Sequence, residues 1–285
     1  MTDERKDKKK QDLLRFVSQV EEEASKITSQ GREIVKQGQF TSDVARYTKQ
    51  FIEAVPDGFF SLTQWDAHTN IWQNALGRAK TYKDSLGDPM GFALIADSTA
   101  TSSTTIITSS LIVRLPPETQ GAAQKAYEGF EQTLEHANIR KDIDTEINRL
   151  GLIALKNTET IASLLIQAEQ AFTTPSVKGV SPSAVLIPLR EAIEQTYTIL
   201  LRRRPLQEPV KGDSSKVRSI CKQCSHTITD SAQIELLAGD ASQLKDLLSG
   251  AKQDSLSRDV VRELLNRGLI YLRTLLRTLD VSKIK

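Results

Sequence analysis

Apolar residues recur along most of this chain at the three-and-four spacing of an α-helix, and this periodicity restricts its fold more than any other feature. The closing segment shows it best, because Ser257 can cap a helix, Asp259 falls in the first turn, and a leucine-rich stripe follows. Turn residues are scarce, with 14 Gly and 9 Pro in 285 residues, which disfavours a fold of many short strands. The stripe comprises Val261, Leu264, Leu265, Gly268, Leu272, Leu275, Leu276 and Leu279.

The same spacing predicts further helices along the chain, and an all-α fold follows. Ser42 is expected to cap the second helix, and Pro117 is expected to open a later one. Ser181-Pro182 is expected to start the first helix of a C-terminal four-helix bundle. We expect a helical N-terminal domain over 1–175 and a C-terminal bundle over 183–285, joined where Pro175, Gly179 and Pro182 interrupt helix formation. The predicted helices span residues 13–27, 42–55, 61–86, a segment opening at 117, 139–171, 182–204, 217–224, 231–249 and 257–279.

Residues 92–113 are the part of the chain whose conformation the pattern leaves open. Ten of the thirteen residues from Ser98 to Ser110 are Ser or Thr, and Ile and Val are frequent nearby. Such β-branched density favours either an extended strand or a buried helix lined with hydroxyl groups. This uncharged segment is also a candidate partner or oligomer surface, and a membrane-active role for it is a more remote alternative.

Basic residues concentrate in the C-terminal part of the chain, although the net charge is only +2. This cluster has two interpretations: it could contact nucleic-acid phosphates, or it could complement a helix C-terminus and keep the surface hydrated. Aromatic residues do not interleave with the arginines, so a stacking platform for single-stranded bases is not supported. The tentative nucleic-acid-binding set is Arg202, Arg203, Arg204, Lys216, Arg218 and Lys222.

Cys221, Cys224 and His226 offer three potential zinc ligands, but a structural zinc site needs four and the chain has no other cysteine. The alternative interpretation is that the two thiols lie on the buried face of a helix. Neither a glycine-rich phosphate loop nor a common hydrolase or metalloprotease motif is present, and His68 and His136 are distant. We therefore assign no catalytic residue and no cofactor.

The order of helices over residues 183–280 resembles the HEPN superfamily, helical bundles of prokaryotic toxin and antiviral systems that include many ribonucleases. The resemblance is carried by the helix ending at Leu200-Leu201-Arg202-Arg203-Arg204-Pro205, the short helix around Val217-Arg218-Ser219-Ile220, a leucine-rich helix and the closing helix to Leu279. Ribonucleolytic members carry an Arg followed after four to six residues by a His. Here seven residues separate Arg218 from His226. The resemblance thus implies a member without the usual active site, working as a binding or regulatory module.

These features lead to two functional hypotheses. The first is a non-enzymatic helical interaction subunit of a prokaryotic complex, in antiviral defence or a toxin–antitoxin pair, with a protein partner or self-association. The second is a nucleic-acid-binding protein or divergent ribonuclease that uses the basic cluster and His226. We expect a cytoplasmic protein without a membrane segment, because the first residues carry no apolar signal segment and the cysteines are few.

Overall fold

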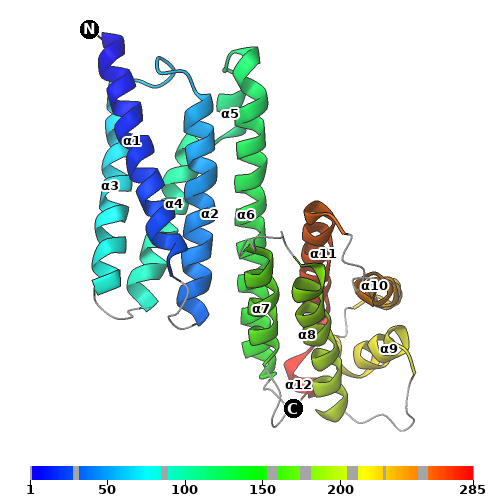
Figure 1. Cartoon of the computed structure of the whole chain (residues 1–285). Coiled ribbons are helices and arrows are strands. Elements are labelled where there is room, and N and C mark those ends of the chain that lie inside the picture. Colours follow the sequence, from blue (N-terminus) through cyan, green and yellow to red (C-terminus); the bar gives the residue numbers. More distant parts are fainter. Residues whose placement is uncertain are drawn as a thin grey trace. The chain divides into compact units, whose positions relative to one another are not determined.

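The computed structural model is all-helical, as the periodicity predicts, and it describes residues 2–27, 32–84, 89–152, 160–173, 181–203, 211–226, 229–249 and 256–284. Within these ranges there is no β-strand, and the one isolated antiparallel bridge joins Ser225 and Leu279. The helices are α1 (Thr2–Ser25), α2 (Arg32–Ala54), α3 (Leu62–Asp84), α4 (Pro89–Ile106), α5 (Ser109–Ile112), α6 (Pro117–Leu150), α7 (Ile161–Thr173), α8 (Pro182–Arg203), α9 (Asp213–Cys224), α10 (Ser231–Ser249), α11 (Arg258–Thr278) and α12 (Val281–Ile284) (Figure 1).

The chain divides into two compact units, Met1–Ala137 and Asn138–Lys285, and the division falls inside α6. The sequence pattern placed the boundary between residues 175 and 183. It falls earlier because the C-terminal half of α6 and all of α7 share one apolar core with α8 to α12. Ile143 of α6, Leu165 of α7 and Leu189 of α8 belong to this core.

In the first unit α1 to α4 lie side by side with their axes roughly aligned, and α1 and α4 each pack against both α2 and α3 (Figure 1). The core between them is rich in aromatic side chains, of which Phe51, Trp65 and Trp72 are fully buried. The helix α2 begins at Arg32, ten residues before the expected cap at Ser42, which is buried within the helix. The predicted start at Ser42 is therefore wrong, since packing against α1 outweighs the weak helix propensity of Gly38 and Ser42.

The hydroxyl-rich segment is helical, which settles the alternative between strand and buried helix. Its hydroxyl groups donate to carbonyl groups of the preceding turn, as Thr99 Oγ1 does to Ile95 O at 2.9 Å and Ser103 Oγ does to Thr99 O at 2.8 Å. Thr48 of α2 donates to Ser103 Oγ at 2.7 Å across the bundle. These bonds satisfy the hydroxyl groups of Thr99, Ser103 and Thr48, so these side chains can be buried in the first unit, whereas the buried Ser102 Oγ has no hydrogen-bond partner among the described residues.

A left-handed glycine interrupts the long helix expected over 139–171. Gly151 has φ +58°, and the following Leu152 N–H donates to Ile147 O at 3.0 Å, which is the six-residue bond of a Schellman motif. The prediction of one continuous helix is wrong for this reason. By contrast, the starts predicted at Pro117, Pro182, Ser231 and Arg258 are confirmed, with Ser257 Oγ accepting from Val260 N at 3.4 Å.

In the second unit α7 packs beside α8, while α9 and α10 run across α8 and α11 (Figure 1). The helices α8 and α11 pack closely at Gly268, where an added Cβ would lie 2.6 Å from Leu189 Cδ2 and 3.1 Å from its Cγ. Glycine is required here because any side chain would collide with Leu189. The remaining inner face of α11 is a continuous row of leucines that contributes to the core of this unit.

Replacing Gly268 by Ala should therefore destabilise the second unit, by about 1–3 kcal/mol in the free energy of unfolding, because the site is already filled. Gly239 on the exposed side of α10 is the matched control, since a Cβ there meets nothing within 4 Å. Gly239→Ala should be neutral or stabilising by up to about 1 kcal/mol.

Urea unfolding followed by circular dichroism measures both variants. Tryptophan fluorescence reports separately on the first unit, which contains Trp65 and Trp72. Equal stability of the two variants would contradict this packing argument.

Candidate functional site

The predicted basic cluster lies at the end of α8 and along α9, and its members differ in their contacts and exposure. Arg203 donates through Nη1 to Leu150 O at 2.8 Å and through Nη2 to Gly151 O. It thereby satisfies carbonyl groups at the C-terminus of α6, where a cation also complements the helix dipole. Arg202 is exposed, and Arg204 lies outside the described residues. The side chain of Arg203 is thus a structural cap within the second unit.

The cations of α9 face carboxylates of the same unit. Arg218 forms a forked pair with Glu235 of α10, with Nε 2.9 Å and Nη2 2.8 Å from Oε2. The hydrogen bond from this guanidinium lowers the pKa of Glu235. Lys216 Nζ lies 3.1 Å from Asp213 Oδ1, while Lys222 is exposed. Two of the predicted cations, Lys216 and Arg218, are thus paired with carboxylates, which weakens their attraction for a phosphate backbone.

Cys221, Cys224 and His226 do not converge on a common point. Neither cysteine forms a disulfide, and both lie on the buried face of α9 in the core of the second unit. Burial raises the pKa of the Cys221 thiol to about 11, so it stays protonated at neutral pH. The His226 ring is half-exposed instead, with Nδ1 3.7 Å from Asp280 Oδ2. Among the described residues, no group of three or more His, Cys, Asp or Glu side chains is placed to hold a metal ion.

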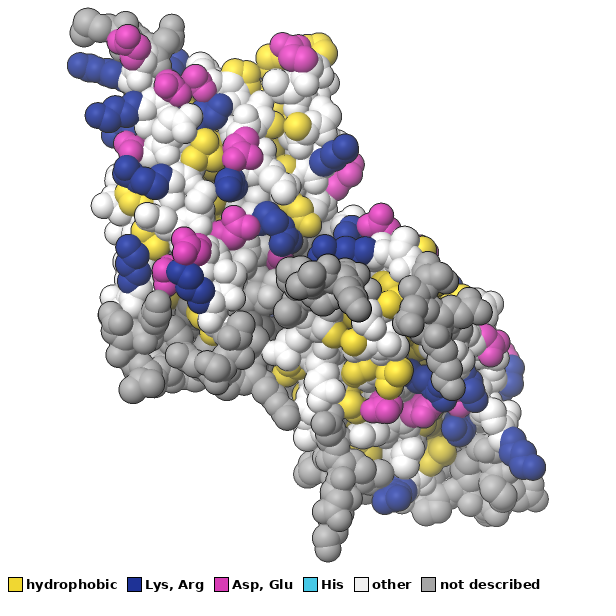
Figure 2. All heavy atoms as spheres, in the orientation of Figure 1, with side chains coloured by type: hydrophobic (Ala, Val, Ile, Leu, Met, Phe, Trp, Pro, Cys, Tyr) yellow, Lys and Arg dark blue, Asp and Glu magenta, His cyan; other side chains and the backbone are white. Residues whose placement is uncertain are grey.

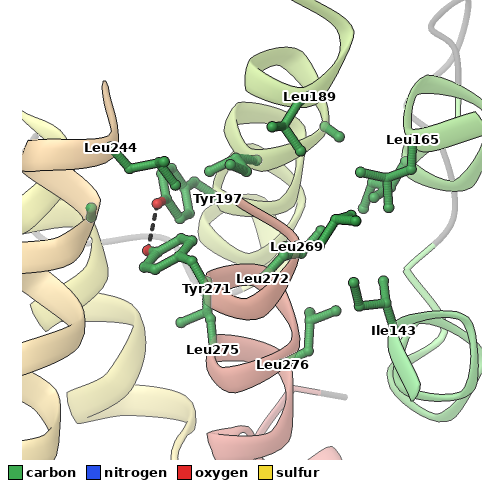
Figure 3. Packing of buried hydrophobic residues seen from close by; sticks show 14 of the residues in the cluster. Ile143, Leu165, Leu189, Tyr197, Leu244, Leu269, Tyr271, Leu272, Leu275 and Leu276 are labelled. Atoms are coloured by element: carbon green, nitrogen blue, oxygen red, sulfur yellow. Dashed lines mark hydrogen bonds between the residues drawn. The ribbon is translucent and has the colours of Figure 1, made fainter. Parts of the chain in front are cut away.

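A buried pair of tyrosines is the feature of this unit that sequence reasoning missed. The hydroxyl oxygens of Tyr197 on α8 and Tyr271 on α11 are 2.5 Å apart, beside Leu244 of α10 (Figure 3). Burial raises the pKa of both phenols, and the nearby carboxylate of Asp213 acts in the same direction. The sequence signal was a tyrosine at or directly beside the apolar positions of each helix, since a buried phenol needs a hydrogen-bond partner.

A shallow surface hollow between α8, α9 and α10 is lined in part by Tyr197. Arg190 and Glu194 line it and are paired at 2.8 Å. Lys245 and the nearly buried Asp213 also line it, with 3.7 Å between Nζ and Oδ2. Each cation thus has a carboxylate neighbour, so the hollow has no surplus charge to attract a charged ligand. The arrangement holds α8, α9 and α10 together.

An exposed apolar surface crosses α10 and α11, and we call it the α10–α11 face. On α10, Leu236 is 67% and Leu247 42% exposed, and on α11 Val260 and Ile270 are each 40% exposed. Arg267 of α11 joins the two helices by donating to Gln243 Oε1 at 2.9 Å. Figure 2 shows one side of the molecule, on which hydrophobic side chains of the second unit lie among charges of both signs. Exposed apolar side chains that gather on one surface mark a candidate protein-binding site. The face comprises Leu236, Leu247, Val260, Glu263, Arg267 and Ile270.

Compared with protein-family models, curated proteins and solved structures, the chain matches none of them. In the part of the chain that the structure describes, no helix is long and apolar enough to cross a membrane.

The tyrosine pair predicts how the second unit responds to alkaline pH. The folded-state pKa of each phenol is raised above the ordinary 10.0, so the stability it contributes is complete below that pH. The contribution is lost as the pH rises further, because only the unfolded chain ionises readily. We expect tyrosinate absorbance from Tyr197 and Tyr271 to appear only together with loss of helical circular dichroism.

The double variant Tyr197→Phe/Tyr271→Phe is the control for this titration. It should lose the late, unfolding-coupled phase of tyrosinate absorbance and keep the phases of the other three of the chain's five tyrosines. Titration of all five tyrosines near the ordinary pKa, with the helical signal intact, would show that the pair is not buried as described.

Proposed function

We propose that the chain is a non-enzymatic helical interaction subunit of a larger complex and that it binds its partner through the α10–α11 face. The observation that carries this proposal is the exposure of four large aliphatic side chains on the neighbouring solvent faces of α10 and α11. Leaving them in water is unfavourable, and burying the exposed part of each against a partner contributes a fraction of the about 1.5–3 kcal/mol gained when a fully exposed aliphatic side chain is buried. Glu263 and Arg267 lie among them and supply the charges that orient a partner.

The biological setting that we propose is a prokaryotic complex of antiviral defence or of a toxin–antitoxin pair. It derives from the resemblance of residues 183–280 to the HEPN superfamily, and the order α8, α9, α10 and α11 is compatible with that resemblance. With no matching family model, this part of the proposal rests on helix order and on the missing Arg–His spacing. A member without that spacing is expected to bind or regulate and not to cleave RNA.

Charged substitutions on the face should abolish partner binding. In the cells that encode it, the tagged chain with Leu236→Glu/Leu247→Glu should recover fewer specific proteins than the wild type, as measured by quantitative mass spectrometry. Val113→Glu is the matched control, because Val113 is an even more exposed apolar residue, at 79%, in the first unit. All three proteins should be equally stable, since exposed substitutions shift the free energy of unfolding by only about 0.5 kcal/mol. Identical sets of recovered proteins would refute the proposal.

The competing proposal is a nucleic-acid-binding protein or divergent ribonuclease. It is supported by the exposure of Arg202 and Lys222, while the pairing of Lys216 and Arg218 with carboxylates counts against it. We expect fluorescence anisotropy with labelled single-stranded RNA or duplex DNA to show only weak binding even at low salt. The variant Arg202→Glu/Lys222→Glu should bind no less than the wild type.

A steep fall of affinity with salt that the double variant abolishes would favour nucleic-acid binding instead. RNA cleavage that His226→Ala removes would point to the ribonuclease. Arg190 of α8 lines the charged hollow and is not part of the basic cluster. The variant Arg190→Glu therefore controls for the general effect of removing positive charge.

A further inference from the structure

The exposed stripe of α11 has a symmetry that a general binding surface does not need. Its residues are Val260, Glu263, Arg267 and Ile270, all exposed to solvent. Their spacing of three, four and three residues reads the same in both directions, and their chemistry runs apolar, acidic, basic, apolar. Residues at this spacing lie on one side of a helix. The stripe is therefore complementary to its own reverse.

We propose that the α10–α11 face binds a second copy of the chain, with the two α11 helices antiparallel about a twofold axis. This inference rests on the proposed function, because it names the partner of the same face. With the axis between Glu263 and Arg267, Glu263 lies opposite Arg267 of the second copy, and Val260 lies opposite Ile270 of the second copy. Each contact occurs twice, as in any interface built from the same patch on both subunits.

Electrostatics select this orientation over the parallel one. In a parallel pair in register, Glu263 would face the glutamate of the second copy and Arg267 the arginine, which places like charges together. In the antiparallel pair both contacts join opposite charges, so the two orientations differ in the sign of every central interaction. Arg267 is already held at the surface by Gln243 at 2.9 Å and by Asp240 at 3.9 Å, which limits the side-chain entropy lost on binding.

The helix α10 adds apolar side chains to the face beside the α11 stripe. Leu236, Gln243 and Leu247 are exposed to solvent on α10. Because α10 runs across α11, it does not pair with its own copy about the same axis, and its leucines extend the contact area beside the α11 pair.

A charge exchange tests the pairing of Glu263 with Arg267. The wild type should form a dimer in sedimentation equilibrium, while Glu263→Arg alone and Arg267→Glu alone should each weaken it, raising the dissociation constant on the order of tenfold or more. The two weakened variants should associate with each other when mixed, because opposite charges then meet again. The double variant Glu263→Arg/Arg267→Glu should likewise dimerise. Circular dichroism checks that loss of the Gln243 contact leaves Arg267→Glu folded.

Disulfide formation tests the register. Val260→Cys mixed with Ile270→Cys should give a disulfide-linked dimer of one chain of each kind under mild oxidation. Val260→Cys alone should give little, because two residues 260 would be about 15 Å apart along the helix axis, beyond the reach of a disulfide. The native Cys221 and Cys224 are buried and contribute only background.

The outcomes separate this inference from the proposed function. A wild type that stays monomeric at the highest concentration it tolerates would overturn the self-association and leave the α10–α11 face to a different protein, which the co-purification experiment detects. A wild-type dimer that both Glu263→Arg and Leu236→Glu/Leu247→Glu leave intact would overturn the assignment of the face. Restored association in the charge exchange, together with the mixed disulfide, would establish the antiparallel arrangement.

Discussion

The second unit depends on the burial of one side of α11. This helix presents Leu269, Leu272 and Leu276 to a core that also receives side chains from α6, α7 and α8, and Figure 3 shows how they meet. Gly268 lets Leu189 of α8 come into direct contact with the helix. Because the apolar contacts are confined to this side, the opposite side is free to carry other residues. Packing and surface properties are thus specified by separate positions of one helix.

Helical periodicity predicted the elements well and their grouping poorly. The bounds of α10 and the start of α11 follow from local pattern and capping, because both signals lie within a few residues. The end of α6 was missed, since apolar spacing continues past Gly151 while the backbone there turns left-handed. The division inside α6 was missed because it depends on which core each turn of the helix joins, and sequence spacing contains no information on such long-range contacts.

In the candidate site, likewise, the sequence identified the types of residue but not the groups that they contact after folding. Composition identified Arg203 and Arg218 as a basic cluster, but each pairs with a group far along the chain, Leu150 and Glu235 respectively. Likewise the two phenols of Tyr197 and Tyr271 meet across 74 residues. Charge density along a sequence therefore overestimates the positive potential at the surface, because carboxylates and carbonyl groups brought in by folding offset it. The exposed aliphatic residues were harder to recognise, since only the folded structure shows which members of an apolar pattern remain in water.

The order of residues on the outer side of α11 affects the properties of the free chain. Glu263 and Arg267 separate Val260 from Ile270, so the apolar surface of the free chain is divided and its charges remain hydrated. This limits nonspecific aggregation, which large uninterrupted apolar patches promote. In the proposed dimer the same charges would disfavour the parallel orientation, while the aliphatic residues would add buried apolar area. Specificity and solubility would then depend on the same two residues, and replacing both by leucine would reduce the two properties together.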